Sequence, residues 1–236
     1  MSHRVRLTGL TLLFLITEIS LILFIDKPLS QYLRTVDAAH PALIDFFRAY
    51  TDIGKGLWYA VLSVSGGLVC TALYFRGNLT SARRATVLWL GQVFGFTLIA
   101  INGAGLVADL LKIIVGRARP KLLKMQDFYG FEPFNITSAD WRSFPSGHST
   151  TVFAAACALG LMFPRLRWPL LALAAAVGLS RVMINAHYLA DVVAGAALGW
   201  GVAWLVAQAF SRRGWVFRIR TLQFADTGKS LRHNPQ

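Results

Sequence analysis

Charged residues are scarce in this chain. Asp, Glu, Lys and Arg together make up 15% of its 236 residues, whereas about 25% is usual for a soluble domain. Hydrophobic residues make up 55%, and the mean hydropathy is +0.52. Several apolar runs are long enough to cross a bilayer. These values argue against an ordinary soluble enzyme and predict an integral membrane protein.

Acidic residues are the scarcer kind of charge. The chain has 11 Asp and Glu against 24 Lys and Arg, which gives a formal net charge of +13. In a soluble protein this excess would suggest a nucleic-acid partner. In a membrane protein, basic residues gather in the cytoplasmic loops. We therefore assign most of the excess to topology and the rest to an anion-binding site, and expect no nucleic-acid partner.

Cysteine is also rare, with Cys70 and Cys157 as its only two occurrences. Both lie inside apolar runs and are not spaced as metal ligands, so we interpret them as small core residues. We expect neither a metal nor a cofactor. We find no internal repeat and no linker, so the prediction is one integral membrane domain over residues 1–236.

The apolar runs predict an all-α fold, a bundle of six transmembrane helices. They lie near residues 7–25, 57–75, 87–111, 148–163, 170–186 and 190–210. The first run is long enough to span and precedes no small-residue cleavage site, so we interpret it as a retained helix. The last three runs are rich in Ala and Gly, which lets helices approach closely in lipid.

Loop charges predict the orientation of this bundle. Arginines precede the first span and follow the second, fourth and sixth, so both termini and the basic tail 212–236 are expected in the cytoplasm. Residues 26–56 and 112–147 then lie on the outer face. The first of these segments is interpreted as a short amphipathic helix at the interface. The second is unusually basic for an outer loop, which topology does not explain.

Three clusters of polar residues fall at this outer face. Lys112, Arg119 and Arg181 are cations near the edge of the hydrocarbon, where unpaired charge is costly and marks a functional candidate. Arginine donates two parallel hydrogen bonds to an oxyanion. Ser146 and Gly147 begin a predicted helix, whose free N–H groups form an anion site. Together these residues predict a phosphate-binding site.

Three further residues supply reactive groups. His187 and Asp191 are four apart, so they would share one face if that stretch is helical. The carboxylate would fix the ring tautomer and leave the other nitrogen as a nucleophile. His148 would then protonate the leaving oxygen and later activate water. Positive side chains would replace a metal in this chemistry.

Each cluster has an ordinary explanation when taken alone. A histidine at a membrane interface is commonly just a polar residue at the water boundary. Lys112 could pair with Asp109 one turn earlier, and Pro-Ser-Gly is common before a helix. The argument depends on all three clusters lying in this order on one face with complementary roles.

The combined pattern resembles the three-part motif of the type 2 phosphatidic acid phosphatase (PAP2) superfamily. It reads Lys112-x6-Arg119-Pro120, Pro145-Ser146-Gly147-His148 and Ser180-Arg181-x5-His187-x3-Asp191, and covers residues 112–191. The resemblance implies phosphate binding by Lys112, Arg119, Ser146, Gly147 and Arg181. It also implies His148 as acid, His187 as nucleophile, Asp191 as its orienting partner, no metal, and a site held by a helical bundle.

The leading hypothesis is a lipid phosphate phosphatase of the bacterial inner membrane with its site facing the periplasm or exterior. Candidate substrates are undecaprenyl diphosphate, phosphatidylglycerophosphate, phosphatidic acid and lipid A 1-phosphate. A lipid phosphotransferase with the same site and a non-catalytic lipid transporter are the alternatives. No obligate protein partner is expected. Glu18, in the first span, either hydrogen-bonds a neighbouring helix or lines a lateral groove near the lipid.

Overall fold

The computed structural model describes residues 3–76 and 78–217. All regular elements in these two ranges are helical, and one isolated antiparallel bridge joins Arg117 to Phe131. The predicted all-α fold is therefore confirmed. The predicted basic tail covers residues 212–236. Residues 218–236 of this tail lie outside the described residues.

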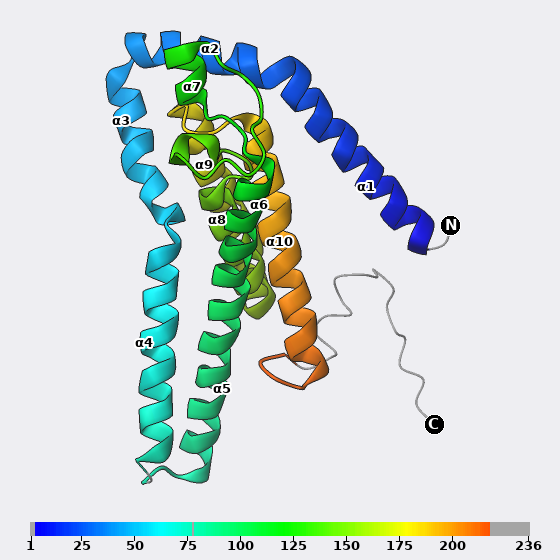
Figure 1. The fold of residues 1–236 in the computed structure, drawn as a ribbon. Coiled ribbons are helices and arrows are strands. Elements are labelled where there is room, and N and C mark those ends of the chain that lie inside the picture. The colour runs from blue at the N-terminus through cyan, green and yellow to red at the C-terminus, as the bar shows by residue number, and fades with distance from the viewer. Residues whose placement is uncertain (1–2, 77, 218–236) are drawn as a thin grey trace.

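The N-terminal part of the chain forms an arm and an outer cap. In Figure 1, α1 projects away from the bundle and α2 crosses its upper end. The elements are α1 (His3–Ser20), a π-helical turn (Leu21–Ile25), α2 (Asp26–Ala39), α3 (Pro41–Tyr50), a 3-10 turn (Thr51–Gly54) and α4 (Gly56–Phe75). The outer segment 26–56 thus holds two helices where one was expected. Pro41 occupies the first turn of α3, a position that suits proline.

A second long helical run follows α4 in the antiparallel direction. It consists of α5 (Ser81–Thr97), a π-helical turn (Leu98–Asn102) and α6 (Gly103–Val115). The run ends at Gly116, whose φ of 59° lies in the left-handed region. A Cβ at this position would come within 1.7 Å of the Glu132 carbonyl oxygen, so only glycine fits. The short helix α7 (Pro120–Gln126) then crosses the outer end of the bundle.

Three helices form the centre of the bundle: α8 (Gly147–Met162), α9 (Arg167–Met183) and α10 (Leu189–Arg212). α8 packs along α10. A Cβ on Gly199 would lie 2.1 Å from the Thr150 carbonyl oxygen, and one on Gly195 would lie 2.6 Å from the Ser146 carbonyl oxygen. The two glycines therefore allow the backbones to touch, which is the packing that the Ala- and Gly-rich runs predict.

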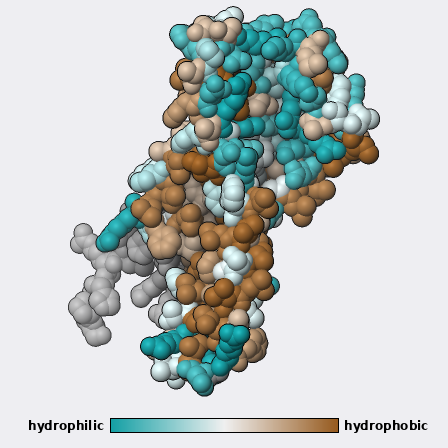
Figure 2. Space-filling model, turned by 90° about the vertical axis from the view of Figure 1, so that its left-hand side faces the viewer, coloured by the Kyte–Doolittle hydropathy of each residue, from teal (hydrophilic) through white to brown (hydrophobic). Residues whose placement is uncertain are grey.

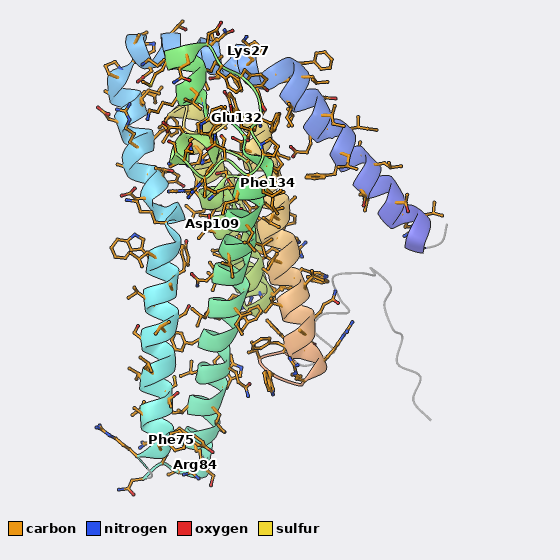
Figure 3. The ribbon with its side chains drawn as sticks, viewed as in Figure 1. Lys27, Phe75, Arg84, Asp109, Glu132 and Phe134 are labelled. Atoms are coloured by element: carbon orange, nitrogen blue, oxygen red, sulfur yellow. The ribbon has the colours of Figure 1, made fainter. Side chains whose placement is uncertain are left out.

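An apolar band separates two polar ends of the molecule. Figure 2 shows the band between a broad hydrophilic upper end and a smaller hydrophilic lower end. Lys27 lies at the upper end and Arg84 at the lower end (Figure 3). Five helical segments of the described part are long and apolar enough to cross a membrane. The expected number of six is not confirmed, because α8, the counterpart of the predicted span 148–163, has only 16 residues.

Candidate active site

The structure brings the three predicted clusters to the upper end of the bundle. Ser146 is the N-cap of α8, and its hydroxyl accepts a hydrogen bond from the Ser149 amide at 3.4 Å. The Ser146 amide donates to the Asp191 carbonyl at 2.8 Å. The amide of His187 donates in turn to the Arg181 carbonyl at 3.2 Å. Backbone hydrogen bonds thus tie the start of α8, the start of α10 and the end of α9 together.

Arg119 and Arg181 are partly buried in this region and have spare donors. Arg119 donates to the Arg142 carbonyl at 3.5 Å, and Arg181 donates to the Thr51 hydroxyl at 3.1 Å. The Nε of each guanidinium is buried and has no partner among the described residues. Burial lowers the pKa of Arg119, and nearby Asp140 and Asp191 oppose that shift only in part. Buried N–H groups are normally satisfied, so each guanidinium keeps a donor with which it could bind an anion.

Lys112 lies in the last turn of α6, directly over the start of α8. A Cβ on Gly147 would come within 2.9 Å of the Lys112 Nζ atom, so the glycine leaves room for the ammonium group. The same Nζ forms an ion pair with Asp109 at 2.7 Å. Lys112 therefore lies in the predicted cluster. It also forms the ion pair with Asp109 that was the alternative explanation for its position. Its carboxylate partner is largely exposed and is exchangeable for a phosphate.

His148 lies at the N-terminus of α8 between the cations and the outer cap. It interacts electrostatically with Arg181, His187 and Lys112. A Cβ on Gly54 would approach the His148 ring to 2.8 Å, so the turn before α4 packs directly on the imidazole. A cavity of about 530 Å³ reaches Gly147 and His148. It lies between α4 and α6 and is lined on one side by Gly54 to Leu57 and on the other by Ile101 to Asp109.

His187 and Asp191 lie side by side, as their spacing predicts. The His187 Nδ1 atom is 3.4 Å from the Asp191 Oδ2 atom, an ion contact whose geometry falls short of a hydrogen bond. The same oxygen accepts shorter hydrogen bonds from the Tyr188 amide at 2.9 Å and from the Ser143 hydroxyl at 2.5 Å. Burial lowers the pKa of His187 to about 4, although Asp191 acts in the opposite direction. The ring is therefore neutral at pH 7, as a nucleophile must be.

Sequence reasoning missed a buried charge cluster behind Asp191. Its centre is Arg117, only 1% of whose side chain is exposed. Arg117 donates to Asp191 at 2.7 Å, to Asp26 at 2.8 Å and to the Tyr129 hydroxyl at 2.9 Å. The carboxylates Asp191 and Asp26 raise the pKa of Arg117 by more than burial lowers it. The missed signal was the cost of burying a third arginine at this depth, which requires a carboxylate partner.

Glu18 of α1 lies near this cluster rather than in a groove. It is 5% exposed, and neither carboxylate oxygen has a hydrogen-bond partner among the described residues. It interacts electrostatically with Asp191, Asp26 and Arg117. It is absent from the lining of the cavity beside His148. Neither expectation for Glu18 is therefore supported. In residues 3–76 and 78–217, no three His, Cys, Asp or Glu side chains are grouped as metal ligands would be.

The fold and the site define a class of protein. A bundle of membrane helices that holds unpaired cations beside two histidines is suited to phosphate chemistry. Residues 92–215 match the model of the PAP2 superfamily. The chain therefore belongs to the PAP2 superfamily.

Individual relatives agree with this assignment. A lipid A 1-phosphatase of Rhizobium johnstonii is 38% identical over 178 residues, which cover 72% of this chain and 68% of that protein. A lipid A 1-phosphatase of Rhizobium etli is 35% identical over 175 residues, 72% of each chain. The fold resembles the crystal structure of a transmembrane PAP2-type phosphatidylglycerolphosphate phosphatase from Bacillus subtilis. The TM-score is 0.56 at 23% identity, over 90% of this chain and 98% of that one. The protein is thus a membrane lipid phosphatase, a hydrolase of phosphoric esters.

Proposed function

We propose that the protein hydrolyses the terminal phosphate of a lipid through a phosphohistidine formed on His187. The observation that carries this proposal is the set of buried, unpaired guanidinium donors of Arg119 and Arg181 next to the two histidines. Pre-arranged donors around a developing negative charge lower the barrier to phosphoryl transfer. The positions of the histidines then divide the reaction between a nucleophile and an acid.

The phosphate would be held from two sides. Arg119 and Arg181 supply their free N–H groups, and Lys112 supplies a positive charge after Asp109 is displaced. The N-terminus of α8, with Ser146 and Gly147, supplies backbone amides and the positive end of the helix dipole. These groups neutralise a dianion and match its tetrahedral oxygens.

The reaction would proceed in two balanced steps. His148 takes up a proton when the phosphate dianion binds beside it. The free Nε2 of His187 then attacks phosphorus, the bond from phosphorus to the lipid oxygen breaks, and His148 gives that oxygen its proton. Asp191 stabilises the positive charge that appears on the His187 ring. A water molecule then attacks phosphorus, His148 takes its proton, and the N–P bond breaks. Inorganic phosphate leaves, and both histidines return to their starting states.

The cavity between α4 and α6 would admit a lipid from the side. Leu57 and Leu106 of its lining are more than 60% exposed and face the apolar band. Asn102 and Asp109 add polar groups to the lining, and Asp109 lies between Leu106 and Lys112 along α6. We propose lipid A 1-phosphate as the first substrate to test, since two relatives carry that activity in their names. The site would face the periplasm, and the lipid would enter from the outer leaflet.

A panel of lipid phosphates tests this function in purified protein. The panel contains lipid A 1-phosphate, undecaprenyl diphosphate, phosphatidylglycerophosphate and phosphatidic acid, and phosphate release is measured. We expect turnover of at least one lipid and a loss of about 10⁴-fold or more in His187→Ala, because no other group replaces the nucleophile. His40→Ala, at the α2–α3 junction, is the matched control and should keep wild-type rates.

Other results would contradict the proposal. Equal phosphate release by wild type and His187→Ala would refute the mechanism. Transfer of phosphate to a second lipid without free phosphate would identify a phosphotransferase. Binding of lipid phosphates without turnover of any would favour a transporter or scaffold.

A further inference from the structure

Arg117 is the centre of a hydrogen-bond network that lies behind the active-site pocket and includes Asp191. Its Nη1 donates to Asp191 Oδ1 at 2.7 Å, and its Nη2 donates to Asp26 Oδ2 at 2.8 Å. The Tyr129 hydroxyl accepts from Nη2 at 2.9 Å and donates to the Ile22 carbonyl at 2.5 Å. All three charged side chains are at most 1% exposed. Such a network holds its members in one geometry because each alternative leaves a buried charge unpaired.

The two oxygens of Asp191 have separate functions in this arrangement. Oδ1 contacts Arg117, whereas Oδ2 faces His187 at 3.4 Å and accepts from Ser143 and the Tyr188 amide. Loss of Arg117 would free one oxygen and let the carboxylate rotate away from the imidazole. By holding Oδ1, Arg117 therefore also helps to fix the position of Oδ2 beside the His187 ring.

Charge balance explains the presence of Asp26. Asp191 assists His187 by its negative charge when the ring becomes cationic, but a lone Arg117 beside it would cancel that charge. Asp26 restores one net negative charge to the group of Asp26, Arg117 and Asp191. Its Oδ1 also accepts from the Ala190 amide at 3.2 Å, one residue before Asp191. Asp26 thus fixes both the guanidinium and the backbone that carries the catalytic carboxylate.

Asp26 comes from a part of the chain that the family match leaves out. It is the first residue of α2, it precedes Arg117 by 91 residues, and the match begins at residue 92. We propose that Asp26 and Arg117 are positioning residues of the reaction, through which the N-terminal segment orients Asp191 and thereby His187. This inference deepens the proposed function and depends on His187 as its nucleophile.

A double-mutant cycle tests the positioning role in the full-length protein. Asp26→Asn keeps the shape of the side chain and removes its charge. We expect kcat to fall at least tenfold while KM changes less than threefold, because neither residue touches the lipid. In an Asp191→Asn background, the same substitution should lower kcat less than threefold, since the residue through which it acts is already neutral.

Matched controls separate positioning from a general loss of structure. Asp37→Asn removes another carboxylate of α2, one that is half-exposed and 3.9 Å from Arg48, and should keep wild-type kcat. Arg117→Lys keeps the charge and should retain more activity than Arg117→Gln. Thermal melting of every variant identifies any that fails to fold, and Asp26→Asn with Arg117→Gln removes both charges of the pair if Arg117→Gln alone unfolds.

The outcomes distinguish this inference from the function on which it rests. Turnover that survives His187→Ala refutes the proposed mechanism. Turnover that requires His187 but is unchanged in Asp26→Asn refutes the positioning role alone. An equal fold-change of kcat in the wild-type and Asp191→Asn backgrounds also refutes it, because the effect would then not pass through Asp191.

Discussion

Arg117 and Arg119 are separated by one residue, yet Arg117 is fully buried, Arg119 is partly buried, and their partners differ. Arg117 donates hydrogen bonds to two carboxylates and to a tyrosine hydroxyl. Arg119 has one long contact to a carbonyl, and its Nε has no partner in the described ranges. The comparison separates a cation that the protein pairs with its own carboxylates from one that keeps a free donor.

The same contrast extends to the residues around the two arginines. The pocket side contains Arg181, whose Nε is also unpaired, and the cavity that opens beside His148. The network side contains Asp26, Asp191 and Ser143. Asp26 accepts a hydrogen bond from Arg117, and Asp191 accepts one from Ser143. His187 lies at the boundary between the two sides. The pocket side keeps unpaired guanidinium donors, whereas Arg117 on the network side is paired with two carboxylates.

Among substitutions that probe this contrast, the largest expected effect comes from removing a cation of the pocket side. Arg181→Gln should lower kcat/KM by about 10²- to 10³-fold, the usual effect of losing one transition-state donor. The measurement is phosphate release from the best lipid of the panel. Arg167→Gln, in the first turn of the same helix, is the control and should remain near wild type. A fall of less than threefold in Arg181→Gln would remove this residue from the phosphate site.

A pH dependence tests whether His187 is buried in its neutral form. Its folded pKa of about 4 lies below the ordinary value of 6.5, so the unfolded chain binds the proton first as pH falls. Wild type should therefore lose about 2 kcal/mol of stability relative to His187→Asn between pH 7 and pH 5. Melting temperatures of both proteins across this range measure the difference. A constant difference would contradict burial of a neutral ring.

The smallest expected effect concerns Lys112, the one pocket cation that already has a carboxylate partner. Asp109→Asn removes the charge that competes with phosphate for Lys112. Because Asp109 is 69% exposed, the pair contributes little, and inhibition by inorganic phosphate should tighten about threefold. Weaker inhibition would show that Asp109 supports the cation instead of competing for it.

The sequence predicted the pocket side because its residues follow fixed local spacings. His187 lies two residues before α10 begins, and it still reaches Asp191 in the first turn of that helix. The Ser-Gly pair at residues 146 and 147 marks a helix start. Because successive spans run in opposite directions, motifs that are far apart in the sequence were expected at the same end of the bundle. The site residues were therefore accessible from patterns no longer than twelve residues, once the helices were recognised.

The network side followed no such pattern. Asp26 and Arg117 are 91 residues apart, and no spacing rule relates them. Their pairing depends on how α2 crosses the bundle, which is a tertiary property (Figure 1). The predicted count of six spans is not confirmed, since α8, which begins at Gly147, has only 16 residues. The cost of an unpaired buried Arg117 was the one available clue.

Inhibition by inorganic phosphate tests the contrast between the two arginines most directly. The inhibition constant is measured for wild type, Arg117→Lys and Arg119→Lys during turnover of one lipid. Arg119→Lys should weaken phosphate binding about tenfold or more, because an ammonium group cannot reproduce the guanidinium fork. Arg117→Lys should change the inhibition constant less than threefold while kcat falls. Equal weakening of phosphate binding in both variants would contradict the division into a ligand-binding side and a self-paired side.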